Sequence, residues 1–466
     1  MALLIALLLM LALLSLRKVA KRKQESKHKY PRCLPSLPII GSLLHFVRDP
    51  QLHLLFSRLQ QKYGSLYSFY MGSNYVVMVN NYQHAKEVLH KKGKIFGGRP
   101  HTVTTDLLTL NGKDIAFASY SPLWKMQRKL VHSALHMFGE GTLALEKIIC
   151  TEASSLCENL AAAQDSPLNL GTELTCSVTN VVCSLCFNSS YKRGDPELEN
   201  VLKYSKGIVD TTFKHSLVDI FPWLQETFNN DSINDLMDVL LKAKLNTENN
   251  NSHLLPGLEL TDDYLLMTVA DIFGAGVETT ATVLKWSILY LLHYPEVTLH
   301  YPNMAQPTSD RQHLPYLEAT ISEVLRIQPV APLLIPHEAL EDTSIGEYII
   351  PKGTHVIINL WSIHHDEKEW DKPKEFNPGR FLDEDGNRIY SPSPSYFPFG
   401  AGIRVCLGEA LAKMELFLFL AWTLQRFTLS VPEGHVLPEP VGKFGVVLQA
   451  PEFKVKVTLR EAWKEK

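Results

Sequence analysis

Apolar residues recur along the chain mainly at helical spacing, and alternating patterns are confined to shorter segments near the two ends. Helical spacing, with an apolar residue at every third or fourth position, covers residues 51–62, 81–91, 123–160, 262–290, 317–327 and 409–427. Alternation, which is typical of strands, covers residues 65–79, 345–350, 355–360 and 429–459. The sequence Pro351-Lys-Gly lies between two of these segments and predicts a turn. We therefore expect a mainly α fold with small β-sheets.

The amino-terminal segment differs from the rest of the chain. Residues 2–16 are apolar except Ser15, and a cluster of basic residues follows them. Basic residues after an apolar run, rather than before it, favour a signal-anchor with the remaining chain on the cytosolic side. A cleaved signal peptide and a buried core helix are the alternatives. We divide the chain into an anchor over 1–20, a basic and proline-rich spacer over 21–45, and one globular body over 46–466.

The overall composition excludes several classes of protein. The 466 residues are 45% hydrophobic and 20% charged, which is typical of a globular chain. The formal net charge of −3 gives no reason to expect nucleic-acid binding. The seven cysteines form no zinc-binding pattern, so we expect mostly inert thiols in a reducing compartment.

The strongest chemical signal is the loop over residues 399–408, which reads Phe-Gly-Ala-Gly-Ile-Arg-Val-Cys-Leu-Gly. A cysteine thiolate is a strong metal ligand, and Cys406 lies just before a predicted helix whose positive end would face the sulfur. Gly402 and Gly408 allow a close approach of the backbone. Arg404 supplies a cation suited to a carboxylate, and Phe399 would shield the sulfur from water.

This loop resembles the haem-binding loop of the cytochrome P450 superfamily. The resemblance implies the P450 fold, haem b with Cys406 as the axial ligand of the iron, and a haem-thiolate monooxygenase domain over 46–466. Glu323 and Arg326 match the ExxR helix of the superfamily, and Arg380 in Pro378-Gly-Arg-Phe completes its structural set. The residues that the resemblance places around the haem are Arg99, Trp124, Arg128, His337, Phe399, Arg404 and Cys406.

The segment Ala275-Gly-Val-Glu-Thr-Thr280 resembles the central helix of the same superfamily. The resemblance implies that Gly276 opens the helix for dioxygen, and that Glu278 and Thr279 form an acid–alcohol pair that delivers protons to it. An ordinary hydrogen bond from the threonine to the preceding helical turn is the alternative for Thr279. No flavin or dinucleotide fingerprint is present, so electrons would come from NADPH through an external reductase.

Over most of its length the body resembles the steroid 17-hydroxylase and 17,20-lyase branch of the superfamily. This implies hydroxylation of progesterone or pregnenolone at carbon 17 and cleavage of the 17,20 bond. Most of the residues that match the steroid pocket are small or apolar, as a flat rigid sterol requires. They are Ser205, Ala116, Phe117, Ile208, Val209, Asp271, Gly274, Ala275, Val330, Ala331, Ile335, Val446 and Val447.

The branch also implies partners and a location. We expect the endoplasmic reticulum membrane, with the catalytic domain cytosolic, and two partners, NADPH–cytochrome P450 reductase and cytochrome b5. Cations that would dock the acidic cytochrome b5 are Arg311 and Lys413, whereas Ser322 stands where a third cation is expected, which predicts weak lyase activity.

The chain departs from the branch at two places. It is markedly shorter after residue 225, and shorter and dissimilar around residues 298–308. An inactive, truncated haem-binding isoform and a monooxygenase of another lipid therefore remain as alternatives.

Overall fold

In the computed structural model, the described residues are 30–47, 49–138, 143–163, 166–192, 194–200, 202–203, 207, 217–220, 261–300 and 313–463. All structural statements refer to these residues. The predicted anchor and the candidate residues Ser205, Ile208, Val209 and Arg311 lie outside them, as do the two places where the chain departs from the steroid branch, apart from residues 298–300.

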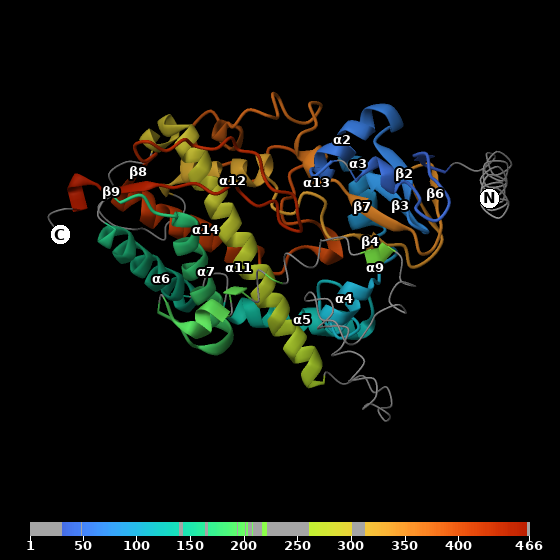
Figure 1. Cartoon of the computed structure of the whole chain (residues 1–466), viewed down its shortest axis with the longest axis horizontal. Helices are drawn as coiled ribbons and strands as arrows, with labels where there is room; N and C mark the ends of the chain where they lie inside the picture. Colours follow the sequence, from blue (N-terminus) through green and yellow to red (C-terminus); the bar gives the residue numbers. More distant parts are fainter. Residues whose placement is uncertain are drawn as a thin grey trace, which may run out of the picture.

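Helices make up most of the described chain. The long helix α11 crosses the molecule, and the helices packed around it form the larger part of the body (Figure 1). The core between them is apolar and includes Trp286, Phe417 and Leu289. The principal helices are α2 Leu52–Tyr63, α3 Tyr82–Lys86, α4 Val103–Leu108, α5 Pro122–Phe138, α6 Leu143–Ala162, α7 Leu170–Phe187, α9 Leu217–Ile220, α11 Asp262–His293, α12 Pro315–Ile327, α13 Leu360–His364 and α14 Glu409–Arg426.

Most strands form a separate, smaller part that lies beside α2, α3 and α13, whereas β8 and β9 lie at the other end of the molecule, near α14 (Figure 1). A five-stranded sheet has the order β1-β2-β3-β7-β4, and two two-stranded sheets pair β5 with β6 and β8 with β9. The strand bounds are β1 Arg32–Cys33, β2 Leu66–Met71, β3 Asn74–Val79, β4 His337–Glu338, β5 Thr343–Ile345, β6 Tyr348–Ile350, β7 His355–Ile358, β8 Phe427–Ser430 and β9 Lys456–Leu459.

Most predicted elements are confirmed, and the strand predicted over 345–350 is corrected. The predicted helical tract over 123–160 is two helices, α5 and α6. The predicted turn at Pro351-Lys-Gly is confirmed, but the segment predicted as one strand over 345–350 contains a turn: β6 turns back onto β5 around Gly346, and β7 pairs in parallel with β3. Parallel pairing between distant segments depends on tertiary packing, which local turn signals do not report.

Helix α7 is the one described helix that is long and apolar enough to cross a membrane. More than half of its residues are buried, and it packs along α6 and α11. It is therefore a core helix that places the middle of α11 against the body of the protein.

Candidate active site

The loop that carries Cys406 is held in one conformation by its glycines and by a backbone hydrogen bond. Gly402 has a φ of +70°, and a Cβ atom there would lie 1.9 Å from the Leu89 carbonyl oxygen, so only glycine fits. The Cys406 amide donates to the Phe399 carbonyl over 2.9 Å. Helix α14 begins three residues after Cys406, as the sequence predicts, with Gly408 at its N-cap.

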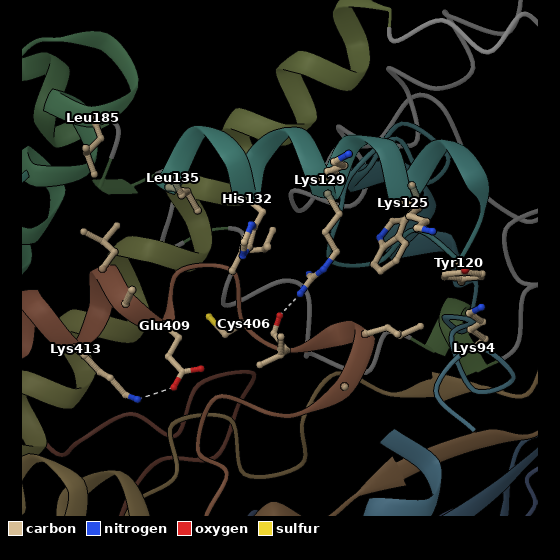
Figure 2. A pocket seen from close by; sticks show the side chains of 18 of the residues that line it. Lys94, Tyr120, Lys125, Lys129, His132, Leu135, Leu185, Cys406, Glu409 and Lys413 are labelled. Atoms are coloured by element: carbon tan, nitrogen blue, oxygen red, sulfur yellow. Dashed lines mark hydrogen bonds and ion pairs between the residues drawn. The ribbon is translucent and has the colours of Figure 1, made fainter. Parts of the chain in front are cut away.

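Cys406 opens on a cavity of about 650 Å³ between α5, the cysteine loop and the start of α14. Figure 2 shows the sulfur facing this space below His132 of α5, with Glu409 and Lys413 at one side. Desolvation by the surrounding protein raises the pKa of the thiol, and the Gly408 amide and Arg128 oppose this shift. A coordinated metal ion would deprotonate such a thiol.

Three arginines converge beside this loop without a matching number of carboxylates. Arg99 donates to the carbonyls of Ala116, Ile335 and Pro336 over 2.7–3.0 Å. Burial and the neighbouring Arg404 hold the pKa of Arg99 well below its usual value. Burial and Arg128 lower the pKa of Arg404 to about 9. The three guanidinium groups of Arg99, Arg128 and Arg404, which we call the cation cluster, therefore repel one another in a low-dielectric environment.

Arg404 has only neutral hydrogen-bond partners. Its guanidinium donates to the carbonyls of Ile115, Gly97 and Ala118, and its buried Nε has no partner. It also lies over the Trp124 ring, 4.1 Å from the centroid. A cation cluster with an unpartnered buried donor fits a ligand that carries carboxylates, and the two propionates of haem satisfy this requirement.

The remaining predicted haem residues lie around the same site. Trp124 donates from Nε1 to the Ile115 carbonyl over 2.9 Å, and Arg128 donates to the Val405 carbonyl. His337 is buried, and its Nδ1 lies 2.8 Å from the Phe96 carbonyl oxygen. Burial and Arg99 lower the pKa of His337 well below its usual value, so this histidine stays neutral at physiological pH.

The predicted structural set is assembled and fully buried at its centre. Glu323 and Arg326 are both 0% exposed and form two hydrogen bonds of 2.7 and 2.8 Å. Glu323 also accepts from the Asn377 amide over 3.0 Å and from Arg380 over 3.4 Å. Arg326 donates further to the His364 carbonyl over 2.8 Å. Each charge of this pair thus has an opposite charge and additional hydrogen bonds.

The central part of α11 holds the predicted acid–alcohol pair. The Thr279 hydroxyl donates to the Ala275 carbonyl over 2.6 Å, the back-bond that was the alternative for this residue. Glu278 accepts from the Gln449 amide over 3.2 Å. Both Glu278 and Gln449 line a second cavity of about 260 Å³ together with Lys285. The sequence does not predict a role for Gln449, because nothing in its local pattern indicates a contact with α11.

The comparisons with known proteins agree with this geometry. The cytochrome P450 family model matches residues 31–231 and 224–457. The chain belongs to the cytochrome P450 family. It is 66% identical over 476 residues to the steroid 17-alpha-hydroxylase/17,20 lyase of Gallus gallus, with 93% of each chain covered. It is 62% identical to the protein of the same name from Rana dybowskii, with 94% of this chain and 91% of the relative covered.

A solved structure is similar over most of the chain. A zebra fish cytochrome P450 with progesterone is 44% identical, has a TM-score of 0.74, and covers 88% of this chain and 99% of its own. A second zebra fish P450 structure, with abiraterone, gives the same TM-score and identity. The arrangement of helices and sheets is thus that of a P450.

Hydrogen bonds connect some of the described substrate candidates of this P450 to one another or to neighbouring residues. Arg99 links the carbonyls of Ala116 and Ile335, and Asp271 accepts from the Ala116 amide. The amide of Leu448, next to the candidate Val447, donates to the Val330 carbonyl over 2.9 Å. Most of the candidates are half-buried or more exposed, namely Ala116, Phe117, Asp271, Gly274, Ala275, Val330, Ala331, Ile335 and Val446. Val447 differs, because it is 4% exposed.

The candidate docking residues of this P450 differ in exposure. Lys413 lies at the edge of the larger cavity and pairs with Glu409 over 2.6 Å (Figure 2). Ser322 is 2% exposed; its hydroxyl donates to the Glu318 carbonyl, and its own carbonyl accepts from the Tyr396 hydroxyl. The serine therefore lies inside the protein and presents no side chain to a partner.

Proposed function

We propose that this P450 is a haem-thiolate monooxygenase that hydroxylates progesterone or pregnenolone at carbon 17 and cleaves the 17,20 bond. The observation that carries the proposal is Cys406 at a cavity beside the cation cluster, in a chain 66% identical to a protein named steroid 17-alpha-hydroxylase/17,20 lyase. The zebra fish structure with progesterone supports a steroid as the substrate class.

The residues present fit haem. Cys406 would bind the haem iron through its thiolate, and Arg99, Arg128, Arg404 and the neutral His337 would hold the propionates. When bound, the haem supplies the activation of dioxygen that hydroxylation requires.

The chain supplies proton handling from α11. The Thr279 hydroxyl donates a hydrogen bond to the Ala275 carbonyl. To relay a proton, the hydroxyl would leave this carbonyl, give up its own proton and receive another at Oγ1. Glu278, in contact with Gln449 and the second cavity, is the acid from which that proton would come.

Electrons would come from NADPH through cytochrome P450 reductase, with cytochrome b5 assisting the lyase step. Lys94, Lys125, Lys129 and Lys413 lie around the cavity at Cys406 (Figure 2) and suit the acidic surface of such partners. The apolar residues 2–16 and the basic cluster after them support an anchor in the endoplasmic reticulum with the catalytic domain cytosolic.

Reconstitution tests the proposal. The full chain is expressed in membranes with reductase, NADPH and progesterone, and Cys406→Ser is the matched control. We expect the red-shifted Soret band of a thiolate-ligated carbon monoxide complex and 17-hydroxylated product, both lost in the variant. A band without steroid product identifies a haem protein that is inactive or acts on another lipid. Absence of the band contradicts haem-thiolate ligation.

A further inference from the structure

Two carboxyl groups bind the backbone amides of residues 115–117. One belongs to Asp271 of α11, and the other belongs to Asp114 in the segment itself. Asp271 of α11 accepts from the amides of Ile115 and Ala116 over 2.6 and 3.2 Å, both at Oδ2. Asp114 accepts from the Phe117 amide over 2.6 Å at its own Oδ2. All three amides from Ile115 to Phe117 are therefore bound by one of the two acids.

The carbonyls of the same residues face the cation cluster. Ile115 accepts from Trp124 and Arg404, and Ala116 accepts from Arg99. The short segment thus connects the candidate haem residues on one side with the centre of α11 on the other. It carries Ala116 and Phe117, which belong to the proposed steroid wall.

The two acids differ in the charges around them. Asp114 is 1% exposed, and its Oδ1 is buried without a hydrogen-bond partner. Its charged neighbours are Arg404 from the cysteine loop and Arg99, whereas the charged neighbour of Asp271 is Asp114. A second negative charge on Asp271 would add repulsion between two carboxylates in a low-dielectric environment.

We propose that Asp114 and Asp271 form a pair that holds one proton between them, and that the protonated pair positions Ala116 and Phe117 for steroid binding. Asp271 is thus a positioning residue, and steroid affinity depends on its proton. The inference rests on the proposed function for the identity of the ligand, and on the hydrogen bonds of residues 114–117 for the pair itself.

The direction of the pH effect follows from the surroundings. Burial, and then the Asp114 charge, raise the pKa of Asp271 to about 8, and the amides of Ile115 and Ala116 oppose this shift. Burial also raises the pKa of Asp114, but the Phe117 amide and the Arg404 cation oppose this shift. Asp271 has no such cation beside it, so Asp271 is the acid that carries the proton at neutral pH. The other charged groups on the neighbouring elements are Arg99, Arg128 and the ion pair between Lys113 and Asp263, and His337 is neutral. Above about pH 8 the two carboxylates repel each other, and the segment that carries Ala116 and Phe117 moves away from α11.

Spectral titration of the holoenzyme with progesterone tests the proposal between about pH 6 and about pH 9. If only the protonated pair binds, the Kd of the wild type should rise about tenfold over this range. Asp271→Asn keeps an acceptor for the two amides but cannot ionise, and its Kd should not change with pH. Asp263→Asn is the matched control, since it removes an exposed acid of α11 that also contacts this segment, through Lys113, and it should retain the wild-type profile.

A second variant distinguishes the two causes of the raised pKa of Asp271, which are burial and the neighbouring charge of Asp114. Asp114→Asn removes the neighbouring charge, so the midpoint of the pH profile should move to lower pH. An unchanged midpoint, or a wild-type Kd that is independent of pH, overturns the proposal.

Thermal unfolding keeps the test independent of the steroid. Because the folded-state pKa of Asp271 is raised, the folded state binds more protons than the unfolded state, and stability should fall as pH rises from about 4 to about 8. Asp271→Asn should lose this part of the slope. If progesterone gives no spectral change at any pH, the proposed function fails. The pH dependence of thermal unfolding then still shows whether Asp114 and Asp271 share a proton. Equal slopes in wild type and Asp271→Asn overturn the pair.

Discussion

Two clusters of buried charge in this P450 are built in opposite ways. In the first, the carboxylate of Glu323 is bound by Arg326, Arg380 and the Asn377 amide, and both central side chains are 0% exposed. In the second, the guanidinium groups of the cation cluster meet mainly backbone carbonyls, and the Nε of Arg404 has no partner.

The difference distinguishes charged residues that stabilise the fold from charged residues that bind a ligand. A buried ion pair with complete hydrogen bonding is satisfied by the chain itself. The cation cluster has three positive charges but, among the described residues, only one neighbouring carboxylate, Asp114, so it gains a matching negative charge only when an anionic group binds. Burial and polarity alone do not distinguish the two clusters, whereas the balance of charge does.

The largest effect on stability is expected at the buried cluster around Glu323. Glu323→Gln leaves Arg326 and Arg380 without a negative partner, and should lower the free energy of unfolding by about 3–5 kcal/mol. The matched control is Glu375→Gln, which makes the same change in an exposed pair with Lys372 and should cost about 1 kcal/mol or less. Denaturant unfolding followed by circular dichroism measures both. Similar losses in the two variants would show that the buried cluster has no special role in the fold.

A large effect on turnover with little effect on stability is expected at Thr279. Thr279→Ala removes the hydroxyl that we assign to proton transfer, which should lower the hydroxylation rate by about 10²-fold or more. Ser287→Ala removes an equivalent back-bond, from Ser287 to the Val283 carbonyl, elsewhere on α11 and serves as the control. Product formed per oxygen consumed is the measurement. Full coupling in Thr279→Ala would reduce this residue to a packed helix position.

The smallest effect is expected at the rim of the cavity. Lys413 is partly exposed and already paired with Glu409, so Lys413→Ala should weaken the response of lyase activity to cytochrome b5 by about 1 kcal/mol or less. The effect should diminish as salt is added, because the charges are screened. Titration of cytochrome b5 at low and high ionic strength measures it. A loss that is independent of salt would contradict an electrostatic contact.

The sequence was sufficient for features that depend on local pattern or on a fixed motif. Helix α14 begins where the periodicity and the cysteine loop place it, and the Glu323–Arg326 pair lies where the resemblance to the ExxR helix implies. Contacts between distant segments were not predictable. The pairing of β7 with β3, the contact of Gln449 with Glu278 and the approach of Asp114 to Asp271 all join residues far apart in the chain.

Ser322 illustrates the same limit on a helix. Its place in the sequence suggested a surface position for docking, but α12 is buried on all sides over its last eleven residues. A helix surrounded by other elements has no solvent-facing side, and a residue's position along the sequence does not reveal this.

Haem release tests the central comparison most directly. Arg404→Met removes a cation that we assign to the propionates, and Arg388→Met removes one that pairs with the buried Glu318. A charge-assisted hydrogen bond contributes about 1.5–3 kcal/mol, so Arg404→Met should release haem about 10- to 100-fold faster than wild type. Arg388→Met should lower the free energy of unfolding but keep the wild-type release rate. Equal release rates in the two variants would contradict the division between charges that hold the fold and charges that bind the haem.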